Sequence, residues 1–219
     1  MAAFPPALLS RLEKSRVVAG FSVEAPEDAV PLAEALLQGG IDVIELTLRT
    51  KAGIEAVALV HEKVPDICAG VGTILTPEQV LAVKQAGADF GVSPGMNPRV
   101  VKASVEADLP FAPGICTPSD IESAVELGCQ LLKYFPAESS GGLNHLRSMG
   151  APYKHLGLRY FPLGGVNAAN MLEYLSEPMV AAVGGSWIVQ PDLVKNKDWS
   201  AIRDRATAVR KALDAGLTT

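Results

Sequence analysis

The sequence predicts an α/β protein with the (β/α)8 fold, the TIM barrel, preceded by a short N-terminal helix. Eight short apolar runs alternate with stretches of helical periodicity along the 219 residues. The runs begin about 20 to 28 residues apart, which suits one strand, one helix and two short loops. Each run is apolar throughout, which is typical of parallel strands covered on both faces.

The eight predicted strands follow one another in a regular order. They are residues 16–23, 42–48, 66–72, 89–93, 110–114, 131–136, 159–165 and 179–185. Eight strand–helix units in a chain of this length favour the barrel over a doubly wound open sheet, which rarely needs so many regular units. No linker or low-complexity tract interrupts the pattern. We therefore expect one domain, residues 1–219.

The segments between the runs carry helix signals. Residues 22–40 have apolar positions at helical spacing and end on two glycines. The helix predicted at 76–88 opens with a Thr76 cap, Pro77 at its first position and Glu78 in its first turn. Further helices are expected at 117–128, which repeats that opening, at 167–176 and at 198–213.

Composition and charge exclude several classes of protein. The net charge of −5 gives no basic footprint for nucleic acid. No apolar run reaches the roughly 18 residues of a membrane span, so no membrane partner is expected. The first 15 residues lack the apolar core of a signal peptide, and Leu8, Leu9 and Leu12 indicate a short amphipathic helix. Three cysteines without a CxxC motif indicate reduced thiols in a cytoplasmic protein: Cys68, Cys116 and Cys129.

The second predicted strand carries three polar residues toward its carboxyl end. In a barrel the active site lies at the carboxyl ends of the strands. Glu45, Thr47 and Arg49 stand at i, i+2 and i+4, so they share one face if the strand continues. At about 3.3 Å per residue, Glu45 should lie deep and Arg49 near the rim.

The sixth predicted strand contains a lysine in an otherwise apolar run, "LLKYFPAES". A buried ammonium without a partner is costly. Lys133 therefore either reaches water or is held in a pocket as a neutral amine. A neutral amine is a nucleophile.

Glycines and hydroxyls follow several other strands. Thr73 closes "GVGT", where the two glycines permit close approach of the backbone, and Pro94 follows the fourth strand. The last two strands end in paired glycines, in the loops where barrels commonly bind phosphate through backbone N–H groups. These residues are Gly164 and Gly165, then Gly184 and Gly185, with the Ser186 hydroxyl beside them.

Each of these features also has a purely structural interpretation. Glu45, Arg49 and Lys133 could form a buried ion network, but that would not explain the glycines after the last two strands. The paired glycines could be plain turns, and Thr73 could cap a strand end. Prolines such as Pro94 more often shape loops than contact a substrate.

Metal-dependent catalysis is disfavoured by the histidines. None of His61, His145 and His155 falls at a predicted strand end, and the chain has no His-x-His or Glu-x-x-His pattern. We therefore expect no metal site and no cofactor, and interpret all three histidines as surface or structural residues.

Six motifs together resemble one enzyme family. They are "GGIDVIELTLRT", "GVGTIL", "SPGMNP", "LLKYFPAE", "LGGVNAANMLEYL" and "VGGSWIV", within residues 16–213. In this order they resemble 2-keto-3-deoxy-6-phosphogluconate (KDPG) aldolase, also called 4-hydroxy-2-oxoglutarate (KHG) aldolase. The combination of E-x-T-x-R, K-x-F-P and G-G-S-W is specific, whereas any one of them alone is not. The resemblance implies a homotrimer of (β/α)8 barrels and a metal-free class I aldolase.

The resemblance also implies roles for individual residues. Lys133 would form the Schiff base and Glu45 would be the acid/base group. Arg49 and Thr73 would hold the pyruvate carboxylate, and Phe135 would pack beside the pyruvate unit. The remaining substrate contacts would come from Pro94, Gly164, Gly165, Gly184, Gly185 and Ser186, the last five at the phosphate end.

Two departures from the family pattern bear on substrate choice. Leu163 stands where the family usually has a threonine, so a hydroxyl that could contact the substrate is absent. The first strand, "VVAGFSVE", also departs from the usual apolar type. Neither change touches Lys133 or Glu45.

The predicted function is cleavage of a small-molecule 2-keto acid, KDPG, to pyruvate and glyceraldehyde 3-phosphate, with KHG as a further substrate. The protonated imine on Lys133 would be the electron sink. Alternatives are an aldolase for an unphosphorylated or epimeric sugar acid, a phosphosugar-binding barrel with isomerase activity, and a non-catalytic trimeric scaffold.

Overall fold

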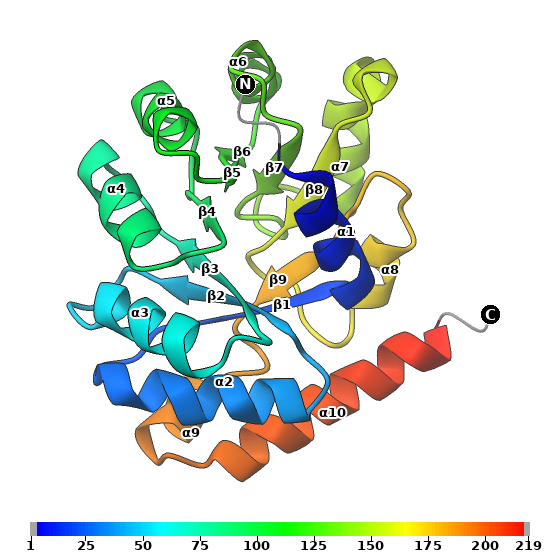
Figure 1. Ribbon diagram of the computed structural model, residues 1–219. Helices are drawn as coiled ribbons and strands as arrows, with labels where there is room; N and C mark the ends of the chain where they lie inside the picture. Colours follow the sequence, from blue (N-terminus) through cyan, green and yellow to red (C-terminus); the bar gives the residue numbers. More distant parts are fainter. Residues whose placement is uncertain (1–3, 217–219) are drawn as a thin grey trace.

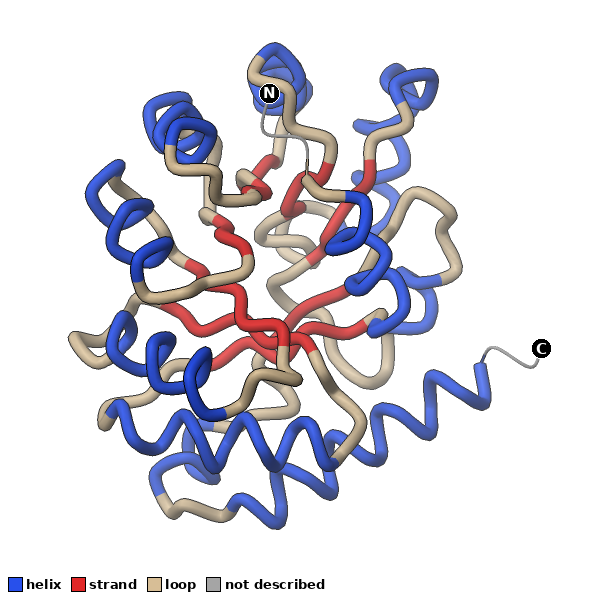
Figure 2. The backbone as a smooth tube through the Cα atoms, viewed as in Figure 1, coloured by secondary structure: helices blue, strands red, loops and turns tan. Residues whose placement is uncertain are grey.

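The computed structural model describes residues 4–216 and has an α/β fold with parallel strands on the inside and helices around them (Figure 1, Figure 2). The strands form two sheets, in the orders β5-β4-β3-β2-β1-β9 and β6-β7-β8. All pairs within these sheets are parallel. The strands are β1 Val17–Phe21, β2 Val43–Thr47, β3 Cys68–Gly72, β4 Phe90–Val92, β5 Phe111–Ala112, β6 Gly114–Ile115, β7 Leu131–Tyr134, β8 Arg159–Pro162 and β9 Val183–Gly185.

The eight predicted strand positions are confirmed, with two corrections. The run 110–114 holds two short strands, because Pro113 between β5 and β6 has no N–H to continue the ladder. In the run 179–185 only the last three residues form β9, and Val180 makes an isolated parallel bridge to Tyr160. A second isolated bridge joins Leu163 to Gly184. The sheet therefore curls, and β8 approaches the segment that leads into β9.

Helices follow most strands and pack on the outside of the curled sheet (Figure 1). They are α1 Pro6–Ser15, α2 Ala29–Gln38, α3 Gly53–Lys63, α4 Pro77–Gln85, α5 Pro98–Glu106, α6 Pro118–Glu126, α7 Gly142–Gly150, α8 Met171–Leu175, α9 Pro191–Lys195 and α10 Trp199–Gly216, with the 3-10 helices η1 Pro26–Asp28 and η2 Ala151–Leu156. Thr76 caps α4 as predicted, although its capping-box partner is Gln79. The helical stretches predicted above do not include α3, α5, α7 or α9. No helix in residues 4–216 is long and apolar enough to cross a membrane.

The predicted helix at 22–40 is wrong over its first part. Residues 22–25 form an extended and bent segment, η1 follows, and α2 begins only at Ala29. Pro26 starts the 3-10 turn, and a proline disfavours helical geometry in the residue before it. The difference matters because the 22–28 segment lies at the cavity described below.

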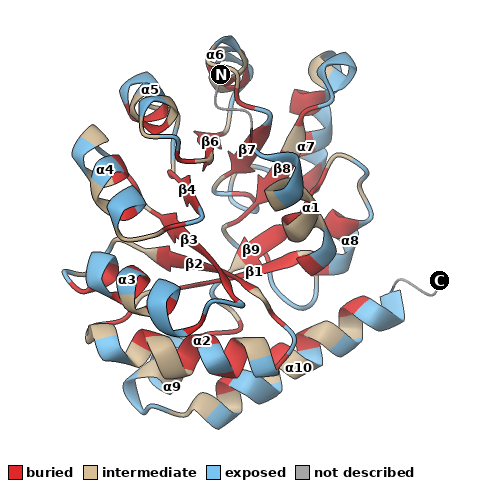
Figure 3. Ribbon diagram, viewed as in Figure 1, coloured by how far each residue is buried: buried red, intermediate tan, exposed pale blue. Residues whose placement is uncertain are grey.

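Most strand residues are buried (Figure 3), and the strands separate two apolar clusters. The larger cluster lies between strands and helices and includes Ile44, Leu46 and Leu132. The smaller one includes Val43 and Leu131, which alternate with those residues along β2 and β7. Successive side chains of a strand point to opposite faces. Glu45 and Lys133 therefore point to the same inner side of the curled sheet as Val43 and Leu131.

The N-terminal segment covers the amino ends of the strands. Leu12 of α1 is fully buried, and the Phe4 ring packs edge-on against Phe90 at 6.0 Å between centroids. Both belong to the inner cluster with Val18, the second residue of β1. Burying a large apolar side chain contributes roughly 1.5–3 kcal/mol to the free energy of folding. The contact therefore stabilises the inner core and covers it at this end. The opposite, carboxyl end of the strands is left open.

Candidate active site

At the carboxyl end of the strands, a lysine and a glutamate form a buried ion pair. Lys133 on β7 places its Nζ 2.9 Å from Oε1 of Glu45 on β2, and their side chains are 6% and 3% exposed. Of the two options that the sequence context suggested, access to water is therefore wrong: Lys133 is held in a pocket, with the Glu45 carboxylate as its partner. Removing one partner of a buried pair strands the other charge, so the two residues depend on each other.

A glycine on the neighbouring strand makes room for this pair. A Cβ at Gly72 of β3 would lie 1.9 Å from Oε1 of Glu45. Gly70 does the same for the Phe90 ring, 2.1 Å from such a Cβ. The glycines of "GVG" do permit close approach of other atoms to the backbone, as predicted, and those atoms belong to the side chains of Glu45 and Phe90.

The second oxygen of Glu45 is buried without a partner among the described residues. Oε2 is inaccessible to solvent and accepts no hydrogen bond within residues 4–216. An unsatisfied buried carboxylate oxygen is costly in a resting protein. Its position beside an amine suits a group that takes a proton from a bound molecule.

The pair lies on a cavity of about 950 Å³. The predicted site residues Arg49, Phe135, Gly164, Gly165, Gly185 and Ser186 also line it. The Phe135 ring centroid is 5.4 Å from Nζ of Lys133, within cation–π range. The predicted substrate-site residues Thr73, Pro94 and Gly184 are not among the described residues of its lining.

Those three residues have contacts of their own. Thr73 is half-buried with a left-handed φ of 61°. The Pro94 carbonyl leaves no space for a side chain at Gly114, with its oxygen 2.2 Å from a Cβ built there. Gly184 gives space to the side chains of Leu163 and Phe161.

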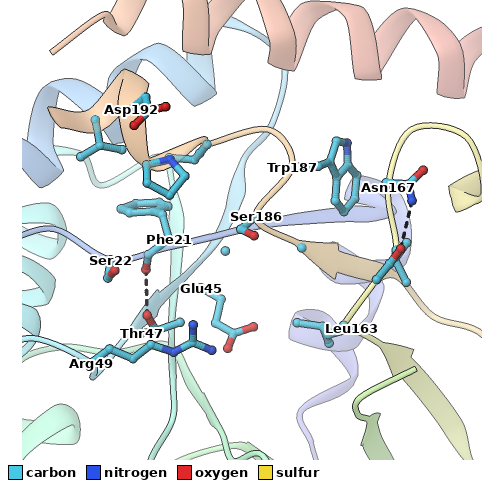
Figure 4. A pocket seen from close by; sticks show the side chains of 18 of the residues that line it. Phe21, Ser22, Glu45, Thr47, Arg49, Leu163, Asn167, Ser186, Trp187 and Asp192 are labelled. Carbon is cyan, nitrogen blue, oxygen red and sulfur yellow. Dashed lines mark hydrogen bonds between the residues drawn. The ribbon is translucent and has the colours of Figure 1, made fainter. Parts of the chain in front are cut away.

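Arg49 lies in the turn after β2, since the strand ends at Thr47. Its side chain nevertheless points into the same cavity as Glu45, as Figure 4 shows. Arg49 is exposed and Glu45 is buried, which matches the predicted rim and deep positions. The Thr47 hydroxyl donates to the Phe21 carbonyl at 3.3 Å, so it fixes the end of β1 beside β2.

On the far side of the cavity the wall is made by loops. Gly164 and Gly165, after β8, have φ of 91° and 88°, in the left-handed region that favours glycine. Among the described residues, neither of their backbone N–H groups donates a hydrogen bond. Ser186 and Trp187 follow β9, and the Trp187 ring occupies the space beside Gly185.

Sequence reasoning missed several residues of the wall. They are Ser22, Glu24, Asp28, Asn167, Trp187, Asp192 and Lys195. Figure 4 shows Asp192 on the side of the cavity away from Glu45 and Arg49. Ser22 and Glu24 stand at the carboxyl end of the first predicted strand, a signal that could have found them, whereas Asp28 and the residues of α9 carry no strand-end signal. The "GGVN" and "GGSW" motifs could have indicated Asn167 and Trp187.

Leu163 reaches the cavity as well. Its side chain is 6% exposed and points toward Glu45 across the cavity in Figure 4. The wall at this point is apolar. A hydroxyl of a bound molecule facing Leu163 would find no partner on that side chain.

The histidines and cysteines lie apart from this cavity. His145 contacts the Cys116 carbonyl at 3.1 Å, His61 fills the space beside Gly87, and His155 is exposed. In residues 4–216 no cluster of three metal-ligating side chains occurs. The three cysteines are unpaired, and burial raises the pKa of Cys68 to about 12 and that of Cys129 to about 11.

Comparisons with known proteins agree on one family. Residues 8–205 match the family model described as KDPG and KHG aldolase. A 2-dehydro-3-deoxy-phosphogluconate aldolase of Haemophilus influenzae is 36% identical, over 94% of this chain and 95% of its own length. One from Treponema pallidum is 41% identical, over 89% and 92%. A crystal structure of KDPG aldolase from Legionella pneumophila, with pyruvate captured as a covalent carbinolamine intermediate, is 38% identical with a TM-score of 0.88, covering 94% and 98% of the two chains.

Proposed function

Because the chain belongs to the KDPG and KHG aldolase family, we propose that it cleaves KDPG to pyruvate and glyceraldehyde 3-phosphate through an imine on Lys133. It is a class I aldolase, a carbon–carbon lyase. The observation that carries the assignment is the buried contact of 2.9 Å between Lys133 Nζ and Glu45 at the cavity. This pair supplies both a nucleophile and a base.

Imine formation starts from that contact. Glu45 takes a proton from the Lys133 ammonium, and the neutral amine attacks C2 of the 2-keto acid. The resulting carbinolamine loses its hydroxyl as water, with a proton returned from Glu45, and becomes a protonated imine. A carbinolamine is the species trapped in the Legionella enzyme.

Carbon–carbon cleavage then needs one base and one electron sink. A carboxylate oxygen of Glu45 takes the proton of the C4 hydroxyl, directly or through one water. The C4–O bond becomes a carbonyl, the C3–C4 bond breaks, and its electron pair moves into the iminium to give an enamine. The aldehyde leaves. Protonation of the enamine carbon and hydrolysis of the imine release pyruvate and restore Lys133.

Arg49 is assigned to the carboxylate of the substrate. A guanidinium binds a carboxylate with two parallel hydrogen bonds, and Arg49 lies on the same cavity wall as Glu45. Phe135, beside Lys133 Nζ, would cover the pyruvate unit. Thr73 remains assigned to the carboxylate by resemblance, and Pro94 and Gly184 to the substrate site, although none of the three lines the cavity.

The phosphate is assigned to the loop wall. Free N–H groups of Gly164 and Gly165, with the Ser186 hydroxyl and the Gly185 backbone nearby on the lining, suit a phosphate. Charge-assisted bonds from several donors are roughly twice as strong as neutral ones. KDPG should therefore be a better substrate than KHG, which has no phosphate.

Leu163 supports relaxed discrimination among sugar epimers. Its apolar side chain offers no hydrogen bond to a sugar hydroxyl, so neither configuration gains a partner there. Without a configuration-specific hydrogen bond at this residue, an epimeric or unphosphorylated 2-keto-3-deoxy acid is an additional candidate substrate.

Three features of the whole protein are also proposed. The parallel bridges Tyr160–Val180 and Leu163–Gly184 support closure of the two sheets into a full (β/α)8 barrel. The hydrogen bond from Lys133 N–H to the Pro113 carbonyl supports continuity between β5 and β6. Family resemblance supports a homotrimer, and the unpaired cysteines support a cytoplasmic location.

Incubation with KDPG tests this function. Pyruvate and glyceraldehyde 3-phosphate should appear in equal amounts, and the rate should survive prolonged EDTA treatment because the iminium is the electron sink. A rate lost to EDTA and restored by a divalent ion would show a metal-dependent aldolase instead. Interconversion of a sugar phosphate without pyruvate release would favour the isomerase alternative.

A further inference from the structure

A tyrosine–glutamate pair lies behind the glycine turn, outside the cavity lining. Tyr174 of α8 is 1% exposed, and its hydroxyl donates to Oε1 of Glu138 at 2.5 Å. Burial and, after it, the hydrogen bond to Glu138 raise the pKa of the Tyr174 phenol strongly, so it remains a donor. The mechanism above uses neither residue.

Glu138 is tied directly to the turn. Its backbone N–H donates to the Gly164 carbonyl at 2.9 Å, and the N–H of Ala137 donates to the Leu163 carbonyl at 2.7 Å. The Cβ and Cγ of Glu138 occupy the space beside Gly165, where an added Cβ would lie 2.5 Å from each. The turn therefore rests on the segment that follows β7.

These contacts decide where the free N–H groups of the turn point. In a trans peptide the C=O and the next N–H point in opposite directions. The Leu163 and Gly164 carbonyls point toward Ala137 and Glu138, so the N–H groups of Gly164 and Gly165 project from the opposite side of the turn. Both glycines line the cavity.

We propose that Glu138 and Tyr174 are positioning residues, which hold the Gly164–Gly165 turn so that its N–H groups face the phosphate of the substrate. This inference rests on the proposed function. The hydroxyl of Tyr174 fixes the Glu138 side chain, and Glu138 fixes the peptide planes of the turn. Removing the hydrogen bond between Tyr174 and Glu138 should weaken binding of the substrate's phosphate and leave the reaction at Lys133 unchanged.

Tyr174→Phe removes the hydroxyl and keeps the ring. We expect the KM for KDPG to rise about 10- to 160-fold, the range for a lost hydrogen bond to a charged group. The kcat should stay within about twofold, because the interaction serves binding. Solvent exchange of the pyruvate methyl protons, which needs no phosphate, should be unchanged.

Tyr153→Phe is the matched control. The Tyr153 hydroxyl donates to Oε1 of Glu122 at 2.9 Å, and neither residue lines the catalytic cavity. The control should leave the KM for KDPG unchanged. Equal KM values for Tyr174→Phe and Tyr153→Phe would overturn the inference. So would a Tyr174→Phe variant in which the rate of methyl-proton exchange falls as much as the rate of KDPG cleavage.

Variants of Glu138 keep the proposal testable if Tyr174→Phe folds poorly. Glu138→Ala should raise the KM like Tyr174→Phe, and Glu138→Gln, which can still accept the hydrogen bond, should raise it less. The double variant Tyr174→Phe/Glu138→Ala should be no worse than Glu138→Ala alone, because both changes break one contact. Additive effects would contradict a shared role. A wild-type protein that fails to cleave KDPG would refute the proposed function, which is a different result.

Discussion

The two ends of the cavity are built from different materials. At the inner end, Lys133 and Glu45 stand on strands and form a buried pair. At the outer end, Gly164, Gly165 and Ser186 stand in loops and offer mainly backbone donors. Side chains on strands are fixed by the sheet, whereas the direction of a loop N–H depends on neighbouring loops. Changes at the inner end should therefore alter kcat, and changes at the outer end should alter KM.

The largest effect should come from Lys133. Lys133→Ala removes the amine that forms the imine, so cleavage of KDPG should fall to background in a coupled pyruvate assay. Lys102→Ala, an exposed lysine of α5, is the control and should retain full activity. Cleavage by Lys133→Ala within tenfold of the parent would place the Schiff base elsewhere.

The same residue should also matter for stability. Lys133→Met leaves the Glu45 carboxylate buried and unpaired, which should lower the free energy of unfolding by about 3–5 kcal/mol in urea titrations. Lys133→Met/Glu45→Gln removes both charges and should recover most of that loss. A double variant as unstable as the sum of the two single variants would show that the pair is not coupled.

Glu45→Gln should break proton transfer and keep the nucleophile. The variant should still form an imine with pyruvate, although more slowly because Glu45 also moves protons in that step. Exchange of the pyruvate methyl protons should slow by about 10²- to 10⁴-fold, the usual contribution of a general acid–base group. Proton NMR in D₂O measures this exchange. Undiminished exchange would move the role to another group, with Thr47 and a bound water as the next candidates.

Gly72→Ala should displace Glu45 without changing its chemistry. The added methyl group would meet Oε1 at 1.9 Å, so the carboxylate must move. A displacement near 1 Å at a catalytic group can lower kcat by about 10²-fold. Gly95→Ala is a suitable control, since nothing lies within 4 Å of its added Cβ. If both variants keep the parental kcat, the position of Glu45 is not critical.

Leu163→Thr should give the smallest effect and confine it to the outer part of the cavity. A restored hydroxyl can add one neutral hydrogen bond, about 0.5–1.5 kcal/mol, so epimer discrimination in kcat/KM should sharpen by about 2- to 12-fold. Methyl-proton exchange of pyruvate should not change.

A comparison of KDPG with KHG as substrates of the parent protein tests whether the loop wall with Gly164, Gly165 and Ser186 binds the phosphate. Equal kcat/KM values for the two substrates would show that it does not.

The inner end could be predicted from sequence because it follows the period of a strand. Glu45 and Lys133 are polar residues in apolar runs, and both point inward with Val43 and Leu131. A buried ion network of these two residues with Arg49 was one interpretation of the sequence. Local pattern could not fix their direct contact, because 88 residues separate Glu45 from Lys133 and only the curl of the sheet brings them together.

The outer end was harder to predict because irregular backbone builds it. The apolar residues at helical spacing begin only at Ala29, where α2 starts, and the irregular segment 22–28 before it forms part of the cavity wall. The paired glycines after β8 did indicate a turn that lines the cavity. Its support by Glu138 and Tyr174 depends on contacts across 36 positions, for which local pattern gives no signal.

Borohydride reduction in the presence of pyruvate, followed by peptide mass spectrometry, tests directly whether Lys133 forms the imine. Borohydride reduces an imine to a stable secondary amine. We expect one reduced pyruvate unit per chain, located on Lys133, with none in Lys133→Ala. If the protein cleaves KDPG but gains no adduct, or gains it on another lysine, then Lys133 does not form the imine.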